Sequence, residues 1–143
     1  HIPQKENKFL SSFDKEIKKS KVQIEKLGFI HDVPAYLKNL DIFLYTSSWE
    51  GSPTALWEAM ASQLAIVTTN VGSASEFVGS KLESGILVRR NNPKDLFLAV
   101  KQLIEDTKLR ETYGLNAYKI AKSNLSVFKI AELHKIAYKQ ILK

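Results

Sequence analysis

Apolar residues along this chain follow two different periods, and the change of period predicts the elements. Short apolar or β-branched runs at 41–46, 65–69 and 85–88 have the length and composition of buried strands. The segment Val22-Gln23-Ile24-Glu25 alternates apolar and polar residues and predicts a further strand. Elsewhere apolar residues recur every three or four positions, which is the period of a helix with one buried face.

The helical period covers most of the remaining chain. Helices are expected at 6–19, 33–39, 53–62, 74–78, 93–105, 108–121 and from 127 to about 141. Asp32 and Ser126 are typical N-cap residues, and Gly114 is expected to interrupt the sixth helix. The inner face of the fifth helix is expected to carry Leu96, Val100, Leu103 and Ile104. Strands that alternate with helices indicate an α/β fold: a Rossmann-like parallel sheet with helices on both faces and right-handed crossovers.

The strand at 41–46 leads through a tight loop into a helix start. Gly51 is free to take a positive φ, Ser52 is a natural N-cap, and Pro53 suits the first helical position. The first backbone N–H groups of such a helix have no partner within it and can bind an anion such as a phosphate. Because proline has no N–H, the open donors are expected on Thr54 and Ala55, with Leu56 as a third candidate.

Two carboxylates, Glu50 and Glu58, bracket this helix start. Glu50 lies in the loop, and Glu58 lies roughly 7 Å along the helix axis at about 1.5 Å per residue. A nucleotide diphosphate at the helix start would reach both, and a ribose diol suits a carboxylate acceptor. The other interpretation is that both glutamates are solvated. An acid among Leu56, Trp57 and Ala59 needs a polar partner if it faces inward.

These residues resemble a known signature. Glu50 and Glu58 are separated by seven residues, and Ala59-Met60-Ala61 follows. The pattern is similar to that of GT-B-fold retaining glycosyltransferases of the family 4, or group 1, type. The similarity continues in order through 27–34, 64–72, 76–78 and 83–88. In all, about residues 22–142 resemble the C-terminal half of such an enzyme.

The resemblance implies a site for a nucleotide-diphosphate sugar donor and retaining transfer of its sugar to an acceptor. Glu50 is implied as the catalytic residue beside the reacting carbon, and Glu58 as the residue that holds the ribose hydroxyls. The amides of Thr54 and Ala55 are implied to hold the diphosphate. The implied donor-binding residues are Ile30, whose backbone meets the base, with Glu50, Ser52, Thr54, Ala55 and Glu58. No metal is expected, because this family does not need one for transfer.

Several neighbouring residues keep two interpretations. Ser73 stands where the family often has a second glycine after Gly72, which weakens any close contact of that loop with the donor. Glu76 is either a helix cap or a donor contact, and Tyr36 either stacks on a base or packs in the core. His31 is more often structural than catalytic in such a position.

The family's acceptor-binding N-terminal domain, and its arginine and lysine for the diphosphate, have no counterpart in this sequence. Residues 1–143 are therefore expected to be a single, partial C-terminal nucleotide-sugar-binding domain, inactive alone. The expected partners are a nucleotide sugar of the UDP or GDP type and, through the other domain, an acceptor glycan or lipid-linked acceptor. Such enzymes take part in polysaccharide or glycolipid synthesis.

Composition narrows the classes of protein but does not choose among them. The net charge is +6 with a pI near 9.4, which suits a polyanionic partner. The chain has no cysteine, which excludes disulfides and fits a reducing compartment. The resemblance, and not the composition, implies a protein that binds no nucleic acid. A reducing compartment predicts the cytoplasm, with peripheral association at the inner membrane face left open. The main alternative is a non-catalytic α/β module that binds a protein or an anionic surface through its lysines; a nucleotide-sugar epimerase is weaker, because the glutamate spacing speaks against it.

Overall fold

The computed structural model describes residues 4–142, with side chains from residue 11 onward. These residues form two compact units, one ending at His31 and the other beginning at Asp32. The first unit consists of helix α1 (Gln4–Lys19) and an irregular segment after it. Lys26 in that segment forms an ion pair with Asp14, and its ammonium lies 5.6 Å from the centre of the Phe13 ring. The helix predicted at 6–19 is confirmed, two residues longer at its start.

The strand predicted at Val22–Glu25 is wrong, because this segment has no regular structure. The exposed fractions of Val22 and Ile24 are 73% and 46%. A strand is stabilised by hydrogen bonds to a neighbouring strand and by a buried face, and this segment pairs with none of the three strands found among residues 4–142. Alternation alone was therefore a misleading signal here.

The second unit is built on a parallel sheet of three strands in the order β1 (Ile42–Tyr45), β2 (Ala65–Thr69) and β3 (Ile86–Val88). Ile42 pairs with Ala65, and Val67 with Ile86. Every residue of β2 is buried, as expected for the central strand of a sheet covered on both faces. The three strands predicted within this unit are confirmed.

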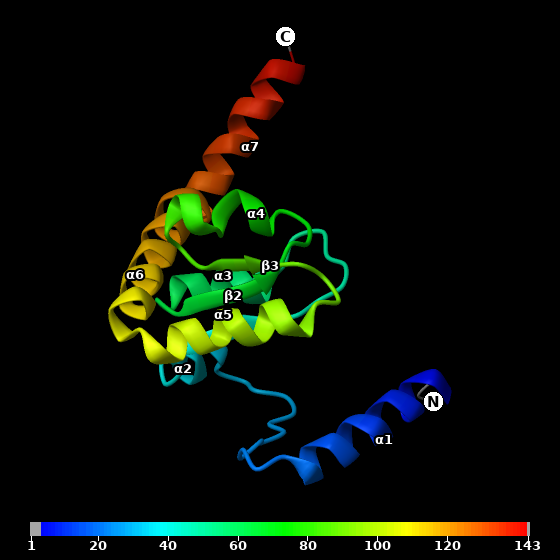
Figure 1. Ribbon diagram of the computed structural model, residues 1–143. Helices are drawn as coiled ribbons and strands as arrows, with labels where there is room; N and C mark the ends of the chain where they lie inside the picture. The colour runs from blue at the N-terminus through cyan, green and yellow to red at the C-terminus, as the bar shows by residue number, and fades with distance from the viewer. Residues whose placement is uncertain (1–3, 143) are drawn as a thin grey trace. The chain divides into compact units, whose positions relative to one another are not determined.

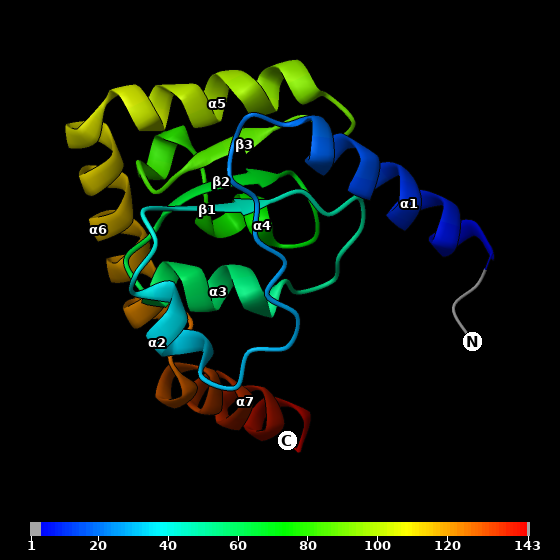
Figure 2. The same ribbon diagram turned by 90° about the horizontal axis from the view of Figure 1, so that it is seen from below.

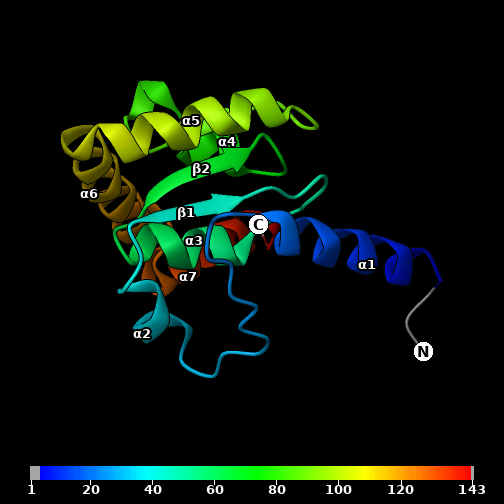
Figure 3. The same cartoon turned by 60° about the horizontal axis from the view of Figure 1, so that its bottom comes forward.

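Helices cover both faces of this sheet. Figure 2 shows α5 on one face and α3 on the other, and Figure 3 shows the same layers around β1 and β2. The helices of this unit are α2 (Val33–Leu37), α3 (Thr54–Ala61), α4 (Ala74–Phe77), α5 (Pro93–Glu105), α6 (Thr107–Asn124) and α7 (Val127–Ile141), with a 3₁₀ turn, η1 (Ser80–Leu82). Asp32 and Ser126 cap α2 and α7 as predicted, accepting hydrogen bonds from the amides of Ala35 and Lys129.

Alternate residues of β2 enter two separate cores. Ile66 packs with α3, α4 and α6, in a cluster that includes the buried Leu56 and Met60. Ala65 and Val67 face the opposite side, where they pack with Ala99 and Leu103 of α5. Because side chains of a strand alternate between its two faces, the central strand joins both layers. The α/β fold predicted from the pattern is confirmed.

Two details of the helices differ from the prediction. Helix α6 runs without interruption through Gly114, where a Cβ atom would lie only 2.4 Å from the carbonyl oxygen of Gln63. The glycine therefore lets α6 approach the turn before β2. Ile104 of α5 is 62% exposed, whereas Ala99 and Leu103 are buried. At 100° per residue, Ile104 lies roughly a third of a turn from the midpoint between Ala99 and Leu103.

Helix α7 follows α6 and extends away from the sheet (Figure 1). Its apolar residues are exposed to varying degrees, including Phe128 at 89% and Ile141 at 78%. The face predicted from its helical period is therefore present, but it is uncovered in the part of the chain that the structure describes. Among these residues, no helix has both the length and the apolar character needed to cross a bilayer.

Candidate functional site

The three parallel strands end at the same edge of the sheet, and the loops that follow them meet there. The loop of residues 46–53 joins β1 to α3, and residues 70–73 join β2 to α4. In open α/β sheets, ligands bind at this carboxyl edge. Most of the predicted site residues lie on the first of these two loops or at the start of α3, so the fold brings them to the edge where binding is expected.

The start of α3 differs by one residue from the prediction. Pro53 is the N-cap, with φ −78° and ψ 86°, and the helix begins at Thr54. Ser52 is not the cap: its Oγ instead accepts a hydrogen bond of 3.2 Å from Nε1 of Trp57. The N-cap is Pro53, whose side chain has no polar atom, so the first turn has no side-chain cap.

The missing cap leaves donors open at the helix start. Leu56 is not one of them, because its N–H donates to the carbonyl oxygen of Pro53 at 3.0 Å. Within the described part of the chain, the N–H groups of Thr54 and Ala55 have no hydrogen-bond acceptor. Thr54 is exposed and Ala55 half-buried. The two amides predicted to bind a phosphate are therefore available for one.

Glu50 is held by a residue that the sequence analysis did not single out. The hydroxyl of Tyr45, the last residue of β1, donates a 2.6 Å hydrogen bond to Oε1 of Glu50. This bond to a carboxylate, together with partial burial and the negative charge of Glu50, raises the pKa of Tyr45 to about 12. The phenol therefore remains a neutral donor at ordinary pH. An aromatic residue with a polar tip at the end of a strand is the only signal in the sequence.

The backbone of the 46–52 loop is fixed from the two neighbouring strands. Oγ1 of Thr69, at the end of β2, donates a 2.6 Å hydrogen bond to the carbonyl oxygen of Ser47. Nη1 of Arg90, just after β3, donates to the carbonyl oxygen of Ser48 at 3.2 Å. These contacts join residues 22 and 42 positions apart in the sequence, so no local pattern predicts them.

Gly72 brings the second loop against the first. Its φ is +50°, and a Cβ atom there would lie 2.3 Å from the carbonyl oxygen of Gly51 and 2.8 Å from that of Glu50. The amide of Ser73 donates to the same oxygen of Gly51 at 3.4 Å. The backbone around Glu50 and the β2–α4 loop thus form one packed unit, which tolerates only glycine at position 72.

Glu58 lies on the exposed side of α3 and lines a groove between this helix and α6. Trp57 and Tyr118 supply aromatic walls to the groove, and Lys122, whose ammonium lies 5.9 Å from the centre of the Tyr118 ring, supplies a positive charge. Among the described residues, no ion pair involves Glu58. Its carboxylate is thus accessible, which a ligand contact requires.

Two of the remaining predicted residues belong to the other compact unit of the chain. Ile30 and His31 belong to the first unit, where the His31 ring lies edge-on to Phe29 at 4.9 Å between centroids. The role of Ile30 in binding a base therefore stays a prediction. Glu76 is exposed on α4 and makes no side-chain capping bond.

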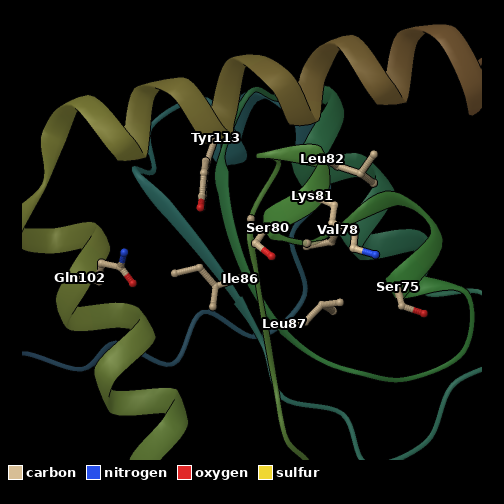
Figure 4. Close-up of a pocket in the computed structure, with 11 residues that line it drawn as sticks. Ser75, Val78, Ser80, Lys81, Leu82, Ile86, Leu87, Gln102 and Tyr113 are labelled. Atoms are coloured by element: carbon tan, nitrogen blue, oxygen red, sulfur yellow. The ribbon is translucent and has the colours of Figure 1, made fainter.

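A separate cavity of about 480 Å³ lies beside β3, away from the predicted site. Figure 4 shows Gln102 of α5 and Tyr113 of α6 pointing toward Ile86 of β3. Ser80 and Lys81 of η1 line its other side. None of the predicted donor-binding residues lines this cavity, so it adds nothing to the arrangement around Glu50.

The sequence of this chain is similar to known proteins over most of its length. The model of the family described as "Glycosyl transferases group 1" matches residues 4–120. Over 97 residues, 68% of this chain, the sequence is 32% identical to the N-acetylgalactosamine-N,N'-diacetylbacillosaminyl-diphospho-undecaprenol 4-alpha-N-acetylgalactosaminyltransferase of Campylobacter jejuni. Over 114 residues, 80% of the chain, it is 30% identical to the capsular polysaccharide biosynthesis glycosyltransferase CapM of Staphylococcus aureus. The matched segments span 27% and 30% of these relatives.

Solved structures show the same fold. The chain superposes on Anabaena HepE in complex with UDP with a TM-score of 0.87 and 23% identity, covering 96% of this chain and 38% of that one. For the C-terminal domain of the group 1 family protein LpcC from Francisella tularensis, the TM-score is 0.75 and the identity 24%, covering 87% and 66%. The predicted fold class, the C-terminal half of a GT-B glycosyltransferase, is confirmed.

Proposed function

This chain belongs to the group 1 glycosyl transferase family, and from that premise we propose that the protein is a retaining glycosyltransferase. It transfers a sugar from a nucleotide-diphosphate donor to an acceptor, with retention at the anomeric carbon. Residues 1–143 supply the donor-binding part. The chain folds alone, binds UDP- or GDP-type nucleotides weakly, and does not turn over without the domain that binds the acceptor.

The observation that carries this proposal is the pair of open amides at the start of α3. The N–H groups of Thr54 and Ala55 lack acceptors within the described chain, and they stand at the positive end of a helix dipole. Glu50 precedes them in a fixed loop, and Glu58 follows one turn later with an accessible carboxylate. A diphosphate on the amides leaves the two acids free to accept hydrogen bonds from sugar and ribose hydroxyls.

The chemistry follows from charge. In transfer, the bond between the anomeric carbon and the β-phosphate oxygen breaks, and the acceptor hydroxyl oxygen forms the new glycosidic bond. The proton of that hydroxyl passes to the departing diphosphate. Negative charge grows on the departing diphosphate, where fixed N–H donors lower the energy of the transition state. Positive charge grows at the anomeric carbon, beside which the proposal places the carboxylate of Glu50. No step in this scheme draws on a metal.

Two relatives suggest the class of acceptor. The Campylobacter jejuni enzyme and the Escherichia coli UDP-Gal:alpha-D-GlcNAc-diphosphoundecaprenol alpha-1,3-galactosyltransferase, 30% identical over 83 residues, are named for lipid-linked acceptors. We extend this class to the present protein: a polyisoprenoid diphosphate that carries the growing glycan. Its cytoplasmic site of action would then be at the inner face of the membrane, and the net charge of +6 suits an anionic surface.

The test is titration of UDP and GDP into the chain, followed by amide NMR and calorimetry. We expect the resonances of Thr54, Ala55 and Glu58 to shift at millimolar nucleotide. Thr54→Pro removes one amide donor at a first helical position, where proline is tolerated, and should weaken binding about three- to tenfold. Thr54→Ala keeps the N–H and is the matched control, expected to bind within about twofold of the original chain. Absence of shifts at these residues contradicts the proposal.

A second function has two observations in its favour. The uncovered apolar face of α7 and the excess of lysines suit a non-catalytic module that binds a partner protein or an anionic surface. In that case, Glu58→Ala leaves all binding unchanged, and added salt abolishes it as screening increases. If Glu58→Ala lowers the affinity of the chain for the nucleotide, this interpretation is excluded.

A further inference from the structure

Tyr45 connects the end of a strand to the side chain of Glu50. Its ring is parallel to that of Phe43, with 6.1 Å between centroids and 15° between planes. Phe43 packs against the core cluster on the α3 face of the sheet. The phenol ring is therefore fixed by β1 and the core, and its hydroxyl reaches Oε1 of Glu50 at 2.6 Å.

The other contacts of this loop act on its backbone. Thr69, Arg90 and Ser73 bind the carbonyl oxygens of Ser47, Ser48 and Gly51. None of these contacts determines how the side chain of Glu50 rotates. Among the described residues, the Tyr45 hydroxyl is the single hydrogen-bond donor to this carboxylate, and Oε2 receives none. The carboxylate therefore has one occupied oxygen and one available oxygen.

We propose that Tyr45 is a positioning residue: its hydroxyl holds Oε1 of Glu50, so that Oε2 alone accepts a hydrogen bond from a hydroxyl of the donor sugar. The inference rests on the proposed function, because it assumes that Glu50 meets the sugar. Tyr45 itself does not touch the substrate. Its hydroxyl affects the binding of the sugar moiety and not that of the nucleotide, because in this proposal the amides of α3 bind the diphosphate.

This division predicts a specific change in ligand preference. Without the phenol, Glu50 samples several rotamers, and fixing one of them again opposes binding of the sugar. UDP, which has no sugar beyond its ribose, does not require that ordering. A purely structural role for Tyr45 would instead change the affinities for UDP and for a UDP-sugar by the same factor.

The experiment measures dissociation constants of UDP and UDP-glucose for the full 143-residue chain and three variants. Tyr45→Phe keeps the ring and its packing on Phe43 but removes the hydroxyl. We expect its affinity for UDP to change by less than about twofold, and that for UDP-glucose to fall about three- to tenfold. Glu50→Gln should lower the UDP-glucose affinity by at least as much. Tyr138→Phe, on the exposed face of α7, is the matched control and should change neither constant.

A second readout tests the hydrogen bond without any ligand. The Tyr45 phenol should titrate near pH 12 in the original chain, and Glu50→Gln should move its pKa toward the ordinary value of 10. Ultraviolet absorbance of the phenolate, compared with Tyr45→Phe, isolates this titration. Ionisation of Tyr45 near pH 10 in the original chain means that the bond is absent, and it overturns the inference.

The possible results distinguish a failure of this inference from a failure of the proposed function. If Glu50→Gln weakens UDP-glucose selectively and Tyr45→Phe does not, the inference is wrong and the proposed function stands. If neither variant changes the preference for UDP-glucose over UDP, Glu50 does not meet the sugar, and both are wrong. If both variants weaken UDP-glucose selectively, and the phenol titrates near pH 12, the positioning role is supported.

Discussion

The 46–52 loop and helix α7 show two opposite relations between sequence and surroundings. The loop has no regular structure of its own, yet its backbone and one side chain are fixed by residues from β1, β2 and the turns after β2 and β3. Helix α7 has a Ser126 cap and a clear helical period, yet its apolar residues are exposed within the described chain. The element with the stronger local signal is thus the one with fewer tertiary contacts.

This difference between the loop and α7 indicates that stability and function are coupled in the loop. A loop without regular structure holds one geometry only if hydrogen bonds and close packing fix it, and binding sites are commonly built in this way. A helix with its own cap and periodic pattern needs less support to form, but its apolar face contributes to stability only when something covers it. Substitutions should therefore be costly in the loop and nearly neutral on α7.

The largest effect is expected from Gly72→Ala. A Cβ atom would meet the carbonyl oxygens of Gly51 and Glu50 at 2.3 and 2.8 Å, in a left-handed backbone with φ +50°. Strain and overpacking together should reduce the free energy of unfolding by about 2–4 kcal/mol, measured by urea denaturation. Gly28→Ala is the matched control, because Gly28 has φ +66° and nothing within 4 Å of a Cβ atom. Equal losses in the two variants would show that the loops are not in close contact.

A smaller loss is expected from Thr69→Val. The substitution keeps the β-branched shape but removes the 2.6 Å hydrogen bond to the carbonyl oxygen of Ser47 at a site that is 6% exposed. We expect the free energy of unfolding to fall by about 1–2 kcal/mol and nucleotide affinity to fall with it. In the control, Thr112→Val, the lost bond lies within the exposed part of α6, so the change should stay within about 0.5 kcal/mol. A neutral Thr69→Val would mean that the loop does not depend on this contact.

The bond between Tyr45 and Glu50 should make stability depend on alkaline pH. The pKa of Tyr45 is raised in the folded state from 10 to about 12, so the protonated phenol is favoured by folding. Its contribution, about 1 kcal/mol, is fully present below pH 10 and is lost as pH rises to about 12. Urea denaturation of the chain and of Tyr45→Phe at pH 8 to 11 should show the difference shrinking above pH 10. When Tyr45→Phe is made in the Glu50→Gln variant, the change in the free energy of unfolding should vary less with pH. If the change caused by Tyr45→Phe in the original chain is independent of pH, this assignment is contradicted.

The smallest effect is expected on α7. Phe128 is 89% exposed at the second position of the helix, and serine has a similar helix propensity. Phe128→Ser should change the free energy of unfolding by less than about 0.5 kcal/mol. Circular dichroism checks that α7 remains helical. A loss above about 1 kcal/mol would show that this face is covered in solution, and the contrast with the loop would then disappear.

Much of the fold was predictable because it depends on local rules. The three strands of the second unit, the caps at Asp32 and Ser126, and the helix start near Pro53 follow from residue pattern and capping chemistry. The errors have a shared cause in tertiary context. Residues 22–25 alternate like a strand but pair with no strand among those described, and Gly114 permits close helix packing where an interruption was expected.

The order of elements, their periods and the Glu50–Glu58 spacing are properties of neighbouring residues, and they indicated both the family and the open amides of Thr54 and Ala55. The support of the site is different in kind. Tyr45 reaches Glu50 only because a turn closes between them, and Thr69 and Gly72 reach the same loop only because parallel strands end at one edge. The contact of Tyr45 depends on the path of the loop, and those of Thr69 and Gly72 join residues about twenty positions apart. A linear pattern carries no measure of either distance in space.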